Sequence, residues 1–381
     1  MNKLYGLAGL AIASALCAPA AAQDPSAPPP AFNPFWVEFD YLGWGVRGDR
    51  LPALVTTSPA GTPPPLAGVL GAPGTTVLFG DSAVNDGFRS GGRATVGYWF
   101  DPAHRSGIEA SFFGLQDAST GFSANSSQYP ILAQPFFNIL TNSQNSFLTG
   151  FPGLVTGSVA ASETSRLFGA GALYRQEIGA WGDARFSGLI GYRFLQASDR
   201  LAIASVAVGN FGAGPTGFDT SDSFGATSDF SGLDLGVAGK FDRGPWMFEA
   251  RAKVALGVNF NQSRINGSTT IATGGATTTY PGGLLALTSN IGDYSQTRFA
   301  AVPELGLKAG YQFAPGWSLV AGYDLLYWTG VQRASGLIDT TINPNLVPPP
   351  LPAGGPQRPQ PMFNTSPLLA QGLSLGVKYE F

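Results

Sequence analysis

The chain has 381 residues, of which 44% are hydrophobic and only 12% are charged, with 52 glycines and 30 prolines. A typical soluble domain is about 25% charged, and this composition favours many strands joined by turns over a helical bundle. The net charge of −3 gives no basic excess, so a nucleic-acid-binding protein is not expected. Cys17 and His104 are the only residues of their types, which excludes an intrachain disulfide and a zinc site of Cys and His ligands.

Residues 1–22 are predicted to form a cleaved signal peptide. An apolar run ends at Cys17, and Ala20-Ala21-Ala22 supplies the small residues of a cleavage site. A proline-rich segment follows over 23–34, and the predicted barrel occupies 35–381. No later stretch reaches about 18 consecutive apolar residues, so no helical membrane span is predicted.

From residue 35 onward, apolar and polar residues alternate with the period of two that is typical of β-strands. The predicted strands lie near 35–44, 93–100, 108–112, 165–177, 185–194, 233–240, 246–258, 299–313, 317–327 and 373–381. Most are long enough for a tilted membrane crossing, which needs roughly 9–11 residues. Strands of soluble proteins usually have about five or six.

The predicted connections alternate between short and long. Short turns are expected at 101–106, 179–182, 242–244 and 314–316, and long loops at 46–89, 119–163, 199–228, 262–296 and 333–367. Short periplasmic turns and long extracellular loops are typical of outer-membrane barrels. The sequence therefore predicts an all-β, antiparallel transmembrane β-barrel of about ten strands (ten to twelve).

The charged residues avoid the apolar face of the predicted strands. A sheet in lipid must close on itself and present apolar side chains outward, and a Lys or Arg on the lipid face costs about 2–4 kcal/mol at mid-depth. A soluble β-sandwich, the alternative, carries its charges on its outer face and shows no such avoidance. The predicted lumen-lining charges are Glu38, Asp40, Arg93, Glu109, Arg185, Arg193, Asp234, Lys240, Glu249, Arg251, Lys253, Glu304, Lys308, Asp324 and Lys378.

The last strand ends with Val377, Tyr379 and Phe381 at alternating positions. This terminal pattern resembles the assembly signal of bacterial outer-membrane barrels, which implies recognition by the barrel-assembly machinery. The lipid face alone also explains the alternation.

The chain as a whole resembles the putative beta-barrel porin-7 family. The resembling segments are Tyr41-Leu42-Gly43-Trp44, Pro52-Ala53-Leu54-Val55-Thr56-Thr57-Ser58-Pro59, Val77-Leu78-Phe79-Gly80, Gly191-Tyr192-Arg193, Pro303-Glu304-Leu305, Gly322-Tyr323-Asp324-Leu325-Leu326-Tyr327-Trp328, Ile342-Asn343-Pro344 and Gln371-Gly372. The resemblance covers about 35–381 and implies a barrel in the bacterial outer membrane. It implies no substrate, because the family has no established one.

Two functions follow as hypotheses. The first is a porin-like barrel with a narrow or largely closed charged lumen and an unknown substrate, since open aqueous channels appear near 16–18 strands. Inward glycines such as Gly97, Gly191 and Gly236 either leave a thin channel or relieve crowding in the wall. The second is a structural or surface-interaction barrel whose long outer loops bind partners, with no transport.

No enzyme activity is expected, and no catalytic, cofactor-binding or metal residue is predicted. His104 lies in a predicted periplasmic turn without an obvious nucleophile beside it. Asp219, Asp222 and Asp229 are close in sequence but lack the 12-residue pattern of a calcium loop. The expected partners are outer-membrane lipid and the assembly machinery, with small solutes or surface ligands left open.

Overall fold

The structure, a computed structural model, describes residues 33–210, 214–352 and 354–381. The predicted signal peptide and nearly all of the proline-rich segment lie outside the described residues. Within these ranges the helices are three short 3₁₀ turns, Pro64–Leu66, Ala334–Leu337 and Pro344–Leu346. No helix among the described residues is long and apolar enough to cross a membrane.

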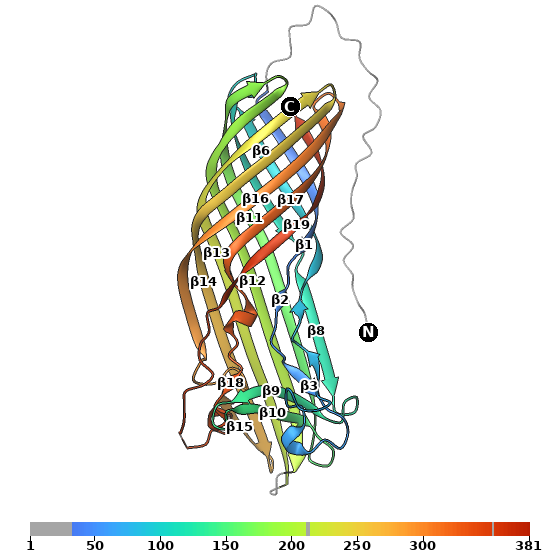
Figure 1. The fold of residues 1–381 in the computed structure, drawn as a ribbon, viewed down its shortest axis with the longest axis vertical. Coiled ribbons are helices and arrows are strands. Elements are labelled where there is room, and N and C mark those ends of the chain that lie inside the picture. The colour runs from blue at the N-terminus through green and yellow to red at the C-terminus, as the bar shows by residue number, and fades with distance from the viewer. Residues whose placement is uncertain (1–32, 211–213, 353) are drawn as a thin grey trace, which may run out of the picture. The chain divides into compact units, whose positions relative to one another are not determined.

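Ten antiparallel strands form a closed ring, which confirms the predicted fold class (Figure 1). They are β1 (Phe35–Val46), β6 (Gly87–Trp99), β7 (Ser106–Leu115), β11 (Val155–Trp181), β12 (Ala184–Asn210), β13 (Pro215–Arg243), β14 (Trp246–Thr273), β16 (Gly292–Ala314), β17 (Trp317–Gln332) and β19 (Thr365–Glu380). Each strand pairs with the next in this order, and β19 returns to pair with β1 from Trp36↔Glu380 to Val46↔Ala370. Closure leaves no free strand edge in the ring, as lipid demands.

Four of these strands are much longer than a membrane crossing requires. β11, β12, β13 and β14 have 27, 27, 29 and 28 residues, against the roughly 9–11 that span a bilayer. The predicted loops over 199–228 and 262–296 are therefore wrong in large part. β12 and β13 pair without interruption to Asn210↔Pro215, and β14 continues to a hairpin with β15 (Ala276–Pro281) at Thr273↔Ala276.

The sequence prediction missed these extensions because of the residues on their outer face. There the outward positions carry residues such as Ser162, Thr164, Ser221 and Ser223, so the apolar outer face that marks the membrane section disappears. The alternation persists with its polarity largely reversed: many inward residues, such as Leu201, Ile203 and Phe224, are apolar and buried, because the outer face now meets water.

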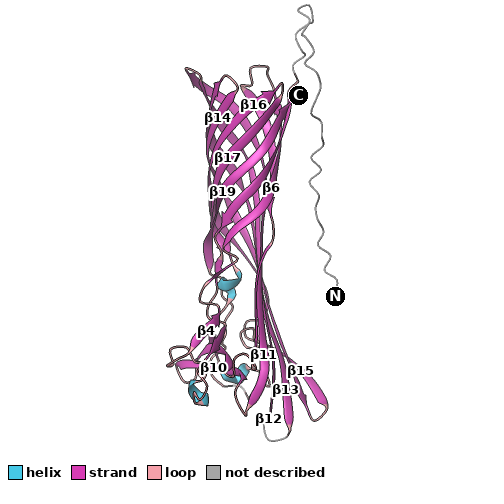
Figure 2. Ribbon diagram, turned by 90° about the vertical axis from the view of Figure 1, so that its right-hand side faces the viewer, coloured by secondary structure: helices cyan, strands magenta, loops and turns pink. Residues whose placement is uncertain are grey.

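The remaining strands arise within the connections that were predicted as loops. They are β2 (Asp49–Arg50), β3 (Val55–Thr57), β4 (Thr76–Phe79), β5 (Ala83–Val84), β8 (Ala118–Asn125), β9 (Leu132–Asn138), β10 (Ser143–Gly150) and β18 (Thr341–Ile342). β10, β9, β3 and β4 form a second small sheet, which β18 joins through β9. We call residues 47–86, 116–154, 282–291 and 333–364 the cap. The small sheet of the cap lies at the end of the barrel opposite the C-terminus (Figure 2).

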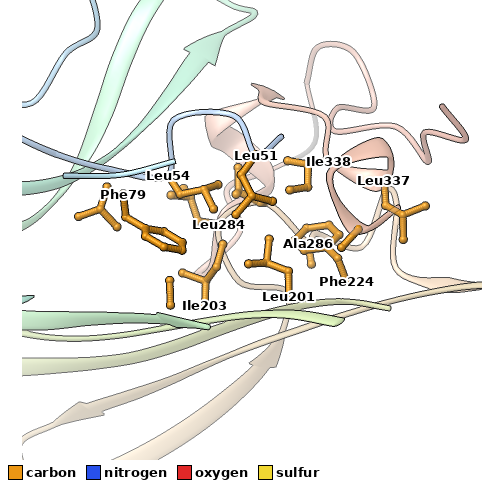
Figure 3. Close-up of a cluster of buried hydrophobic side chains, with 14 of the residues drawn as sticks. Leu51, Leu54, Phe79, Leu201, Ile203, Phe224, Leu284, Ala286, Leu337 and Ile338 are labelled. Atoms are coloured by element: carbon orange, nitrogen blue, oxygen red, sulfur yellow. The ribbon is translucent and has the colours of Figure 1, made fainter. Parts of the chain in front are cut away.

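The cap shares a hydrophobic core with the inner face of the extended strands (Figure 3). The extensions contribute Leu201, Ile203, Phe224 and Ile265, and the cap contributes Leu51, Leu54, Val55, Phe79, Leu132, Leu284, Leu285, Ala286, Leu287, Leu337 and Ile338. Most of these side chains are nearly inaccessible to solvent. The cap is thus a folded part of the barrel, fixed by apolar burial.

The topology can be tested with inserted epitope tags. A tag after Gly274, at the tip of the β14–β15 hairpin, is expected to bind antibody on intact cells, because the long strands project outward. A tag after Gly244, in the short β13–β14 turn, is expected to bind only after the outer membrane is permeabilised. Both glycines have positive φ angles, +58° and +59°, and lie in tight turns. The reverse labelling would overturn the orientation.

The terminal strand gives a second test. On β19 the aromatic ring of Tyr379 lies 4.6 Å from that of Trp317 and 4.8 Å from that of Phe381. Replacing Val377, Tyr379 and Phe381 together by Asp removes this apolar face and should strongly reduce the heat-modifiable protein in the membrane fraction. Asp at Thr277 and Thr279, in the exposed β15 hairpin, is the control. Equal membrane levels in both variants would contradict the assigned role of the last strand.

Candidate functional site

The predicted lumen-lining charges fall into two groups on the inward face. Near the periplasmic turns, Arg185 and Lys240 lie 2.8 Å and 3.3 Å from Asp242, and Lys378 lies 2.5 Å from Glu380. The second group lies deeper and we call it the charged network. Its members are Glu38, Asp40, Arg93, Glu109, Arg193, Asp234, Glu249, Arg251, Lys253, Glu304, Lys308 and Asp324, joined by Arg175.

Ion pairs in the charged network cross the interior between strands. On β6, Arg93 donates from Nε to Asp40 of β1 at 2.7 Å and from Nη1 to Asp324 of β17 at 3.2 Å. On β14, Arg251 donates from Nη1 to Glu109 of β7 at 2.6 Å. Glu109 and Arg251 belong to strands that are not neighbours in the ring. This pair therefore spans the interior of the barrel.

Further pairs link the network into one unit. Lys253 lies 3.0 Å from Glu304 and 3.4 Å from Asp234, and Arg193 also bonds Glu304. Arg175, whose position on its strand also predicts an inward side chain, lies 2.9 Å from Glu249. Two further pairs, Lys308 with Glu38 and Arg251 with Glu249, complete the set. Buried charges need such partners, since an unpaired one carries the full desolvation penalty.

A small polar cavity remains inside the network. Its volume of about 70 Å³, among Glu38, Arg93, Glu249 and their neighbours, leaves room for a few water molecules. The inward glycines make room for large neighbours: a Cβ on Gly97 would lie 2.1 Å from the Trp36 indole, and one on Gly236 would lie 2.6 Å from the Lys253 side chain. This supports relief of crowding as their role.

Beyond the charged network, the same inward face becomes apolar. We call this set the inner apolar layer, and its buried members are Leu42, Trp44, Val46, Phe113, Leu115, Leu167, Leu195, Ala197, Phe230, Ala255, Ala300, Val302, Leu326, Trp328, Val331, Leu368 and Ala370. The rings of Trp328 and Phe230 lie 6.3 Å apart, and the Trp328 Nε1 donates to Asn259 Oδ1 at 2.8 Å. Residues from all ten ring strands except β6 contribute to the layer.

The sequence analysis missed the inner apolar layer, although a signal for it exists. Leu42, Trp44 and Val46 share the even-numbered positions of Glu38 and Asp40 on β1, so strand parity places them inward. The prediction assigned mainly charged residues and glycines to the inward face and expected them to leave a narrow or largely closed lumen. Following the alternation to the far end of each strand would have shown that the inward residues change from charged to apolar.

A second cluster lies beyond this layer, at the base of the cap. The carboxylates of Asp49, Glu163 and Asp199 are buried, and each offers an oxygen atom within 4.8 Å of the others. Ser335 donates to Asp49 from its backbone N at 2.8 Å and from Oγ at 2.5 Å, and the Arg333 guanidinium bonds Asp199. The sequence analysis missed this cluster because all three acids fall in predicted loops.

The Glu163 carboxylate stands apart from its two neighbours. Its side chain is 0% exposed, and neither oxygen accepts a hydrogen bond from any residue that the structure describes. It lies outside the membrane section, since the outward residues of β11 become polar and charged at Thr164 and Arg166. Burial, with the carboxylates of Asp49 and Asp199 beside it, raises the pKa of Glu163 to about 9.

The other candidates of the sequence analysis do not assemble into a site. The His104 ring stacks on Trp99, with centroids 4.9 Å apart, in the turn between β6 and β7. Asp222 faces inward and accepts hydrogen bonds from the backbone N–H groups of residues 284–286. Asp219 and Asp229 occupy the opposite face of β13, so these three aspartates do not converge.

Solved structures of similar fold are outer-membrane barrels of varied kinds. The outer membrane protease OmpT from Escherichia coli is 8% identical, with a TM-score of 0.43 over 92% of this chain and 98% of that one. The translocator domain of the autotransporter NalP from Neisseria meningitidis is 11% identical, with a TM-score of 0.25 over 92% and 89%. A Pseudomonas aeruginosa FadL homologue is 9% identical, with a TM-score of 0.23 over 91% and 90%. These values are too low to carry an argument about function.

Comparison of the sequence with known families identifies the family of the chain. No curated protein matches the chain. The family described as putative beta barrel porin-7 matches residues 36–381. That range contains the closed ring of ten strands, the charged network and the cap. The chain therefore belongs to the putative beta barrel porin-7 family and is an outer-membrane β-barrel.

Proposed function

We propose that this barrel has a closed lumen and serves as a membrane anchor that holds the cap at the cell surface, where the cap binds partners or has a structural role. The inner apolar layer is the observation that carries this proposal. Water-filled barrels have polar interiors, and apolar constrictions in channels exclude water and ions by dewetting. In this chain, solutes would have to pass the charged network, the inner apolar layer and the cap core in turn.

Side-chain packing in both the inner apolar layer and the cap core supports a closed lumen. Trp328, Phe230 and Leu195 are 0% exposed within the inner apolar layer. In the cap core, Leu54 and Phe224 are 2% exposed or less. Interiors packed in this way contain few voids larger than a water molecule. Opening a path would require the cap to leave the extended strands and expose this apolar surface to water.

A porin-like narrow channel is the second candidate. The charged network favours it, because charges that line a pore can give ion selectivity. In that case the cap would act as a movable plug. For either function the partners that we propose are outer-membrane lipid and the barrel-assembly machinery, and we assign the chain no catalytic reaction.

Conductance in planar lipid bilayers separates the two candidates. The purified wild-type protein is expected to give no steady single-channel current. Arg251→Ala is expected to remain silent, because the inner apolar layer and the cap still close the path. Deleting residues 47–86 removes a large part of the cap and serves as the comparison. A stable current from the wild-type protein would overturn the proposal of a closed lumen.

The charged network should contribute strongly to stability. Arg251→Ala and Glu304→Ala each leave partners without compensation in the interior, which typically costs roughly 3–5 kcal/mol. Leu256→Ala on the lipid face should cost less, because lipid can fill the space. The matched control is Arg264→Ala, which breaks an ion pair with Asp293 that is about 70% exposed and should change stability little. Urea unfolding in detergent micelles or vesicles measures all four variants, and equal losses would contradict the assigned role of the network.

A further inference from the structure

The carboxylates of Asp49, Glu163 and Asp199 come together at the base of the cap from β2, β11 and β12. We propose that these three residues bind one calcium ion, which ties the cap to the extended wall of the barrel. The sequence analysis predicted no metal ligand, so this proposal departs from that expectation. It concerns a site apart from the charged network and does not rest on the proposed function.

The spacing of the oxygen atoms fits calcium. One oxygen from each residue lies within 4.8 Å of the other two. Calcium binds oxygen at about 2.3–2.6 Å, so two ligands of one ion are at most about 5 Å apart. Magnesium binds at about 2.0–2.1 Å and prefers octahedral geometry with several waters retained. A buried set of three carboxylates therefore suits the larger cation better.

Glu163 gives the second, independent observation. It is completely buried and points into the cluster, and no amide, hydroxyl or basic side chain among the described residues donates to either oxygen, so the Asp49 carboxylate is its hydrogen-bonding neighbour. Asp49 and Asp199 are different, because Ser335 and Arg333 donate to them. A buried charged carboxylate without a donor is costly. A bound cation would satisfy it.

The positively charged side chains next to the cluster compensate two of its three negative charges. The Arg333 guanidinium bonds Asp199. The Arg89 guanidinium donates to the backbone oxygens of Ser165 at 3.3 Å and Asn85 at 3.1 Å, close enough to interact electrostatically with Asp199 and Glu163. Two cations thus oppose three carboxylates. The cluster therefore carries one negative charge more than these two guanidinium groups compensate, which a bound cation would neutralise.

A polar pocket lies next to the site on the outside of the wall. β6 and β7 pair only as far as Gly91↔Leu115, and beyond this point β8 pairs with β11 instead. A polar pocket of about 350 Å³ lies where they separate, lined by Asn85, Asp86, Gly87, Phe88, Arg89, Ser90, Gln116, Asp117, Ala118, Ser119 and Thr120. The Asn85 amide in this pocket donates to the backbone oxygen of Glu163 at 3.1 Å. Asp86 and Asp117 in the lining would attract cations.

Calcium titration of the folded chain tests the proposal. The protein in detergent is stripped with EDTA, freed of chelator, and titrated with CaCl₂ in a calorimeter. The wild-type chain is expected to bind one calcium ion and to unfold at a higher temperature with about 1 mM calcium than with EDTA. Glu163→Gln keeps the shape but removes the charge, and should weaken binding by roughly tenfold or more. Asp293→Asn, which changes an exposed acid far from the cluster, should bind as the wild type does.

Two other results would contradict the proposed calcium site. A wild-type chain that takes up no calcium would overturn the proposal and would leave a proton as the partner of Glu163. Equal binding by wild type and Glu163→Gln would place any calcium elsewhere and would also overturn it. The wild-type titration is decisive even if the variant folds poorly. If Glu163→Gln folds, its unfolding temperature should no longer respond to calcium.

Discussion

The organisation of this molecule depends on the fixed parity of its long strands. Along most of each strand, a side chain at every second position stays on the inner face, and the alternation shifts at local irregularities such as the one between Glu177 and Gly179 of β11. Over that length the outer surroundings change from lipid to water. The outer face therefore changes from apolar residues such as Leu305 and Leu375 to polar ones such as Ser162 and Thr164. The inner face changes in the opposite sense, from ion pairs to apolar packing.

The two inner sections support each other. The charged network fills the membrane section with side chains whose charges are compensated, so lipid-facing strands can close around a polar interior. The inner apolar layer covers its outer end and limits the access of water. Ion pairs that are shielded from water interact more strongly, and they also lose more when one partner is removed. This arrangement accounts for an interior lined by paired charges and buried apolar side chains, although many of its inward positions are glycine.

The sequence predicts the ring of strands well, because strands that face lipid alternate between apolar and polar residues and carry no charges on their outward face. Strand positions, antiparallel order and the inward side of residues such as Arg93 and Glu249 follow from local parity. The extensions of β12 and β13 do not, since Ser and Thr on a water-facing sheet resemble a loop. The cluster at Asp49, Glu163 and Asp199 is also hidden, because Asp49 lies more than a hundred residues before the other two and reaches them only through the fold of the cap.

Cysteine accessibility tests the central claim, that the inner apolar layer excludes water, most directly. In a Cys17→Ala background, single cysteines replace Ala255, which is 1% exposed in the layer, and Thr279, which is exposed in the β15 hairpin. Folded protein in membranes is treated with a charged thiol reagent. Thr279→Cys should react readily, while Ala255→Cys should react only after denaturation. Rapid labelling of Ala255→Cys in the folded barrel would contradict the account, because it would show a water-filled path through the layer.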